Sequence, residues 1–154
     1  MGNSAAKIYQ TQEIMSASPV RLVAMLYDRA ISSLREAVRA IDAGDIQARC
    51  NANRRAYDIL HHLDMTLDVD KGGKIAENLS QIYAFVLRLL PKIDFDNDKQ
   101  AAEQAIRLLE PLRDSWRELA AGGKDADTAP AAPAPSGHGI ICPDGRGAAR
   151  QRLC

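Results

Sequence analysis

The sequence predicts an all-α protein: an antiparallel four-helix bundle with an N-terminal arm and a disordered C-terminal tail. Apolar residues recur at helical spacing between residues 18 and 120, and no segment alternates with the period of a strand. The breaks between the helical segments are short, which forces successive helices to run antiparallel. The 154 residues therefore divide into an arm (1–17), a bundle domain (18–120) and a tail (121–154).

The first helix is expected to begin at Ser18-Pro19, because serine caps a helix N-terminus and proline is tolerated at the first helical position. Gly44 suits the end of this helix, and Asp45 can cap the next one after a very short turn. Two apolar stripes give the helix a broad buried face, one of Val23, Leu26, Ala30, Leu34, Ala37 and Ile41, the other of Val20, Tyr27, Ile31 and Val38.

The second and third helices follow the same logic. One side of the second helix carries Ile46, Cys50, Tyr57, Leu60, Leu63 and Leu67. The segment 68–73, which contains two glycines, is expected to end it. The third helix shows Ile75, Leu79, Ile82, Val86, Leu89 and Ile93, and Pro91 is expected to loosen or kink its last turn.

A fourth helix is expected after Asp96 or Asn97, either of which can serve as its N-cap. Its apolar stripe consists of Ala102, Ala105, Leu109, Leu112, Trp116 and Leu119. Pro111 lies inside this pattern, which resumes in phase, so we expect a kink rather than an end.

The two terminal segments do not fit the bundle. Residues 1–17 contain Ile8, Tyr9, Ile14 and Met15 without a sustained stripe, which fits either a frayed terminus or a displaceable arm that packs into a groove. The tail holds six of the ten glycines and four of the seven prolines, and few large aliphatic residues. Such a segment buries too little apolar surface to offset the entropy of ordering.

Composition excludes several classes of protein. The 20 basic and 20 acidic residues balance, which argues against a protein that binds nucleic acid through its phosphates. No run approaches the roughly 20 apolar residues that span a bilayer, and the N-terminus lacks the apolar stretch of a secretory signal. We therefore expect a cytoplasmic location, without membrane insertion.

Candidate catalytic and metal-binding residues are sparse. A di-iron bundle needs Glu-x-x-His motifs on two helices, whereas this chain has a single Asp58-x-x-His61. Cys50 falls on an apolar stripe, where a cysteine packs as a small hydrophobe, and three widely spaced cysteines do not suggest a disulfide framework. We expect no enzyme activity, no metal site and no cofactor.

Surplus apolar residues remain on two helices. Beyond a single seam, the first helix carries Leu22, Met25 and Tyr27, and the third carries Tyr83, Phe85, Leu87 and Leu90. They fit either a thicker core or a groove that receives a helix of another protein.

Three blocks of sequence resemble one known family. The first is SASPVRLVAMLYD (16–28), the second is DKGGKIAENL (70–79) and the third is LRDSW (112–116). In this order, with Tyr9 upstream, they resemble the FliS family of flagellar secretion chaperones. One departure is Arg29, which stands where the family usually has glycine.

The resemblance implies a cytoplasmic chaperone that binds the disordered C-terminal segment of flagellin, prevents its premature polymerisation and delivers it to the gate of the flagellar type III export apparatus. It implies a flagellin-binding groove drawn from Met25, Leu26, Tyr27, Asp28, Ile75, Leu79 and Tyr83. It also implies an N-terminal arm, linked to the export gate, that includes Ile8, Tyr9 and Met15. The alternative is a structural or regulatory bundle that forms a homodimer or binds another export component through the same faces.

Overall fold

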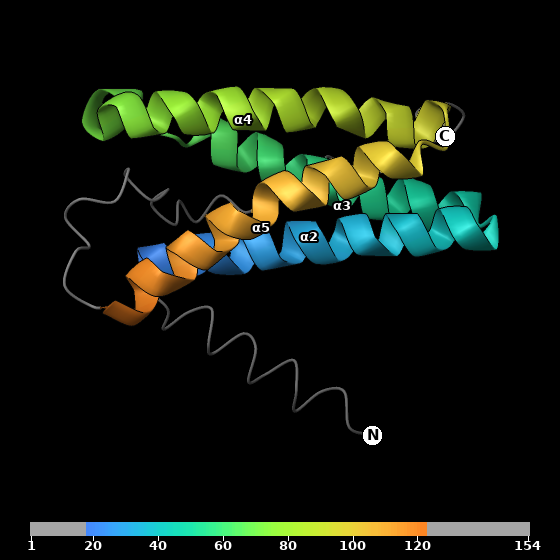
Figure 1. Ribbon diagram of the computed structural model, residues 1–154, viewed down its shortest axis with the longest axis horizontal. Helices are drawn as coiled ribbons and strands as arrows, with labels where there is room; N and C mark the ends of the chain where they lie inside the picture. The colour runs from blue at the N-terminus through green and yellow to red at the C-terminus, as the bar shows by residue number, and fades with distance from the viewer. Residues whose placement is uncertain (1–17, 123–154) are drawn as a thin grey trace, which may run out of the picture.

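The computed structural model describes residues 18–122, which form four helices (Figure 1). They are α2 (Pro19–Ala43), α3 (Ile46–Met65), α4 (Val69–Phe95) and α5 (Lys99–Gly122). The predicted all-α class and four-helix bundle are confirmed. The predicted arm (1–17) and all but the first two residues of the predicted tail lie outside the described residues.

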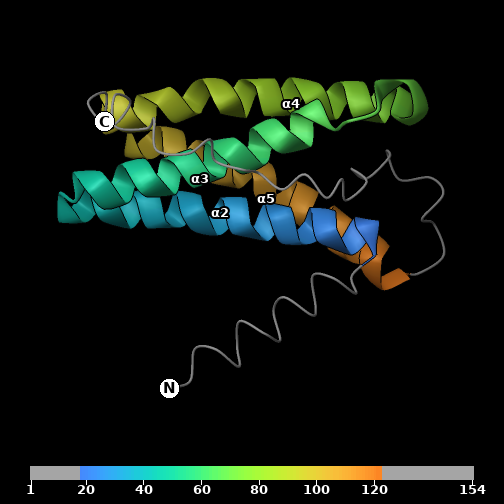
Figure 2. The ribbon, with the colours of Figure 1, turned by 180° about the vertical axis from the view of Figure 1, so that it is seen from behind.

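The helices form a closed ring in which each packs against two neighbours. α2 contacts α3 and α5, and α4 contacts the same two helices from the opposite side. Figures 1 and 2 show α2 and α4 as the outer layers, with successive helices running in opposite directions. α4 packs less extensively against its neighbours than α2 does.

The predicted boundaries of α2 are confirmed by its capping contacts. The Ser18 side chain accepts a hydrogen bond from the backbone N–H of Arg21 at 3.3 Å, with Pro19 at the first helical position. Gly44 ends α2 with φ 68°, a left-handed conformation that favours glycine. Asp45 then caps α3 by accepting from the N–H of Ala48 at 2.9 Å.

Two other boundaries differ from the prediction. The N–H of Ala101 bonds to Asp98 at 3.0 Å, so the side chain at the start of α5 is Asp98 rather than Asp96 or Asn97. Asn97 instead adopts a positive φ of 51° in the turn. The segment 68–73 was predicted to separate the second and third helices, but it contains the first turn of α4, which Asp68 caps. The helical backbone is interrupted only at Gly73 (φ 53°, ψ −135°).

Neither proline ends its helix. α4 continues past Pro91 to Phe95, and its non-helical backbone lies at Gly73 instead of near the proline. α5 continues past Pro111 to Gly122, as the in-phase stripe predicts.

The core is mainly apolar, and a tyrosine pair crosses its diagonal. Tyr27 of α2 and Tyr83 of α4 are 0% and 1% exposed, and their hydroxyls share a hydrogen bond. Their ring centroids are 6.2 Å apart. Burial raises the pKa of Tyr27 to about 12, and burial, then the proximity of Tyr27, raises the pKa of Tyr83.

These raised pKa values predict that the bundle loses stability at alkaline pH. A tyrosine in the unfolded chain has a pKa near 10. The contribution of the two neutral tyrosines to folding stability is therefore complete below pH 10, and it is lost as the pH rises towards their raised pKa values in the folded protein. From pH 10 to 11 we expect the free energy of unfolding to fall by about 2 kcal/mol for the two groups together. Urea denaturation measures it, and an identical fall in the Tyr27→Phe/Tyr83→Phe variant would contradict the assignment.

The buried side of α3 differs from the predicted stripe. Ile46 and Tyr57 were expected to face inward but are 58% and 42% exposed. The buried positions include small and polar residues, namely Arg49, Cys50, Ala52, Asn53, Ala56, Ile59, Leu60 and Leu63. Alanine and asparagine therefore occupy part of the helix face that the large apolar residues were expected to define. The stripes of α4 and α5 also hold exposed members, Ile75 (59%) and Leu119 (37%).

Candidate functional site: a groove between α3 and α4

Exposed large apolar side chains of the described chain concentrate on two helices. α3 carries three of them and α4 carries four, whereas α5 carries only Leu119 and α2 none. The seven are Ile46, Tyr57, Met65, Val69, Ile75, Phe85 and Phe95. The structure thus confirms that Phe85 of α4 is an apolar residue outside the core. The second helix with exposed large apolar residues is α3, whereas the sequence had indicated α2.

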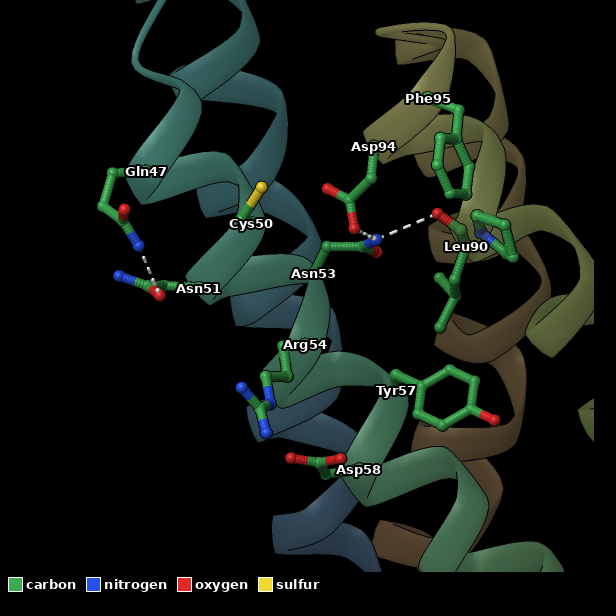
Figure 3. Close-up of a pocket in the computed structure, with 11 residues that line it drawn as sticks. Gln47, Cys50, Asn51, Asn53, Arg54, Tyr57, Asp58, Leu90, Asp94 and Phe95 are labelled. Atoms are coloured by element: carbon green, nitrogen blue, oxygen red, sulfur yellow. Dashed lines mark hydrogen bonds between the residues drawn. The ribbon is translucent and has the colours of Figure 1, made fainter. Parts of the chain in front are cut away.

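A groove follows the outer junction of α3 and α4, and we call it the α3–α4 groove. It consists of two hollows of about 370 and 640 Å³ that share Tyr57 and Pro91 in their walls. The first hollow also contacts Cys50 and Phe95, and the second extends to Phe85. Figure 3 shows the first hollow, with Tyr57 on the α3 side and Phe95 on the α4 side.

Polar contacts at the base of the first hollow join the two helices. The Asn53 side-chain amide donates to the Leu90 carbonyl at 2.9 Å and to Asp94 Oδ2 at 2.6 Å (Figure 3). Arg49, 5% exposed, places its Nε 3.5 Å from Asp94 Oδ1 and hydrogen-bonds to Asn97. This polar cluster ties the start of α3 to the end of α4 and fixes one end of the groove.

Charged and aromatic side chains border the apolar walls. Arg54 and Asp58 line the α3 side of the first hollow, and Arg88 and Lys92 line the α4 side of the second. The Arg88 guanidinium lies 5.8 Å from the centroid of the Phe85 ring. Apolar walls with a charged border suit an amphipathic segment that presents apolar residues to these walls and polar residues at its edges.

The residues named from the family resemblance fall into different environments. Tyr27, Leu79 and Tyr83 are buried in the core, so another molecule reaches them only if the helices separate. Ile75 lies at the exposed start of α4, just beyond the break at Gly73. The structure does not bring these four side chains together in one surface groove.

The remaining named residues lie on α2 or outside the described chain. Met25 and Leu26 are half-buried, and Leu26 packs against the core. Asp28 pairs with α5, where Arg117 Nη2 lies 2.7 Å away and Arg113 Nε 3.8 Å away. The predicted arm residues Ile8, Tyr9 and Met15 lie outside residues 18–122.

Cys50 is buried, as its place on an apolar stripe predicts, but it is also disulfide-bonded. The sequence pattern did not suggest a disulfide. Residues 18–122 contain no other cysteine.

Comparison with known proteins decides the family. A model of the family described as flagellar protein FliS matches residues 1–123. The chain belongs to the FliS family. The match spans all three sequence blocks that resemble the family, and it makes this chain a flagellar secretion chaperone of the FliS type.

Individual relatives of the FliS family agree with this assignment. The chain is 36% identical to the flagellar secretion chaperone FliS of Salmonella typhimurium, over 74% of this chain and 85% of the relative. It is 31% identical to that of Campylobacter jejuni, over 76% of this chain and 91% of the relative, and 24% identical to that of Bacillus subtilis, over 71% and 81%.

Within residues 18–122, no three His, Cys, Asp or Glu side chains are grouped as metal ligands would be. Over the same residues, none of the helices combines the length and the apolar character needed to cross a bilayer.

Proposed function

We propose that this FliS-family chain binds the C-terminal segment of flagellin in the α3–α4 groove, keeps flagellin from polymerising prematurely in the cytoplasm and delivers it to the flagellar export gate. The observation that carries the proposal is the concentration of exposed apolar side chains on α3 and α4, three of which, Tyr57, Phe85 and Phe95, line the groove. A closed bundle gains nothing from exposing these residues to water. A partner that covers them gains about 25 cal/mol per Å² of apolar surface, before the costs of ordering.

The chemistry of the groove fits a segment that folds as it binds. Aromatic side chains at Tyr57, Phe85 and Phe95 provide large contact areas at a low cost in conformational entropy. Coupled folding lowers the affinity gained per unit of buried area, which suits cargo that must later be released and threaded through an export channel.

Isothermal titration calorimetry with the full chain and a synthetic C-terminal segment of flagellin from the same organism tests the proposal. We expect a one-to-one complex with a negative heat-capacity change, because apolar surface is buried. A matched peptide with serines at its large apolar positions serves as the control. Absence of binding at tens of micromolar under reducing conditions would refute flagellin as the partner.

The competing proposal is a homodimer through the same groove, and the same exposed apolar side chains support it. Sedimentation equilibrium distinguishes the two. A chaperone of this kind is expected to be monomeric or to dissociate when the flagellin segment is added, whereas a tight dimer that ignores the segment favours self-association.

A further inference from the structure

The charges around the α3–α4 groove indicate the chemistry of its partner. Three basic side chains border the two hollows, Arg54 on α3 and Arg88 and Lys92 on α4. We propose that the groove selects an acidic amphipathic segment of flagellin, whose carboxylates pair with Arg88 and Lys92 while its apolar residues cover the aromatic walls. This inference rests on the proposed function and adds the charge that the bound segment carries.

One stripe of α4 combines the cations with the aromatic residues of the groove. At intervals of three, four and three residues, it consists of Phe85, Arg88, Lys92 and Phe95, all of them exposed. Such intervals keep the four side chains within about 80° of one another around the helix axis. Along that axis they cover about 15 Å, or nearly three turns. A helix of similar length in the groove therefore meets two cations between two aromatic rings.

The three cations have no carboxylate partner in the part of the chain that the structure describes. None of the ion pairs within residues 18–122 involves Arg54, Arg88 or Lys92. Water hydrates an exposed cation well, so its presence alone requires no partner. Beside an apolar wall, however, a bound segment displaces water from one side of the cation. A carboxylate on that segment replaces the lost hydration and favours acidic partners over basic ones.

The acidic residues of the groove do not offset the cations of α4. Asp94 is paired inside the bundle, where its Oδ1 lies 3.5 Å from the Nε of the buried Arg49. Asp58 lies on α3 four residues after Arg54, and Figure 3 shows both on the same wall of the first hollow. Residues at this spacing are neighbours on a helix surface, so their opposite charges balance locally. The positive surplus therefore lies on the α4 wall.

Contact with an aromatic ring positions one of the two cations of α4. The Arg88 guanidinium lies 5.8 Å from the centroid of the Phe85 ring. This contact restricts the side chain before a partner binds, so less conformational entropy is lost on binding. A planar guanidinium can also bind a carboxylate through two parallel hydrogen bonds. Arg88 is thus well placed to receive an acidic side chain at the edge of the groove.

Calorimetry of charge variants with the C-terminal segment of flagellin tests the pairing. We expect Arg88→Gln/Lys92→Gln to weaken binding about threefold and Arg88→Glu/Lys92→Glu to weaken it about tenfold or more, because attraction is first lost and then replaced by repulsion. The difference between the parent chain and the glutamate variant should shrink at about 1 M salt, where the Debye length is about 3 Å. Unchanged affinity in both variants overturns this inference and leaves the proposed function standing.

A matched control separates the groove from the net charge of the protein. Arg39 of α2 and Arg107 of α5 are also exposed, line neither hollow and form no ion pair within residues 18–122. Arg39→Glu/Arg107→Glu makes the same change in charge and should alter affinity by less than about twofold. An equal loss in this variant overturns the inference. Circular dichroism checks that each variant folds, and the glutamine variant decides if the glutamate variant does not.

A pair of designed peptides decides the inference if the parent chain does not bind flagellin, a result that refutes the proposed function. The two amphipathic helical peptides are identical except at two positions four residues apart beside a leucine face, which carry glutamate in one and lysine in the other. We expect the parent chain to bind the glutamate peptide at least about tenfold more tightly, and Arg88→Glu/Lys92→Glu to reverse the preference. Equal affinities overturn the proposal. So does binding of neither peptide, the result expected if a second copy of the chain covers the groove.

Discussion

Replacing Tyr57 and Phe95 together by aspartate is expected to weaken binding of the flagellin C-terminal segment by about 100-fold or more. The two rings flank the first hollow of the α3–α4 groove and are 42% and 68% exposed. Losing two aromatic anchors from an interface costs several kcal/mol of binding free energy, and each tenfold change in affinity corresponds to about 1.4 kcal/mol. Isothermal titration calorimetry under reducing conditions measures the change.

Two controls make this result specific to the groove. The free energy of unfolding of the double variant should stay within about 1 kcal/mol of the parent chain, because both side chains are largely outside the core. Leu119→Asp introduces one aspartate at a 37% exposed apolar position on α5, away from the groove, and should leave affinity unchanged. Equal loss of affinity in the Leu119→Asp variant would show that the groove is not the binding site.

Arg49→Met is expected to lower the free energy of unfolding by about 3 kcal/mol. It removes the cation beside Asp94 and the hydrogen bond to Asn97 at a site where Arg49 is 5% exposed. Removing one partner of a buried pair leaves a charge without compensation, which costs more than the pair itself contributes. The side chain of Asp94 is 19% exposed, so water screens part of the loss. Urea denaturation of the reduced chain measures it.

A double-mutant cycle shows whether the loss comes from Asp94. Arg49→Met/Asp94→Leu should recover part of the stability, because the uncompensated carboxylate is then absent. Lys99→Met removes a cation from a solvent-exposed pair with Asp42 and should cost less than about 1 kcal/mol. Strictly additive losses for Arg49 and Asp94 would contradict the coupling.

The helix boundaries were largely predictable because local chemistry determines them. Ser18, Gly44 and Asp45 act within three or four residues of their own position, and the structure shows each in its expected role. The cap of α5 was displaced to Asp98 because three neighbouring residues, Asp96, Asn97 and Asp98, can all cap a helix. Spacing alone does not choose among them.

The position of the groove was less predictable from the sequence. The groove is lined by the sides of α3 and α4 that lie at the boundary between the core and the solvent. Alanines and Asn53 form part of the buried face of α3, so the large apolar residues did not mark that face. Tyr57 follows the buried Ala56 and is therefore rotated by about 100° away from the core. A closer signal was available in the Ala52 and Ala56 pair, whose four-residue spacing places two small residues on one face of α3, where both are buried.

The residues named from the family resemblance illustrate the same limit. The block around Tyr27 identified the family, yet its tyrosine lies in the core, where its contribution is to packing. A motif records which positions matter without saying whether they matter for folding or for binding. The binding roles of Met25, Leu26 and Ile75 remain predictions, and those of Ile8, Tyr9 and Met15 concern residues outside the described chain.

The hydrogen bond between the Tyr27 and Tyr83 hydroxyls affects how α2 and α4 are aligned along the bundle. Apolar helices tolerate sliding past one another, because one layer of aliphatic side chains resembles the next. A slip of one turn would move one helix by about 5.4 Å and separate the two buried hydroxyls, and a buried hydroxyl left without a partner costs about 1–3 kcal/mol. This single polar contact between the outer layers therefore selects one register of α2 against α4, and with it the position along the bundle at which α4 presents its aromatic residues.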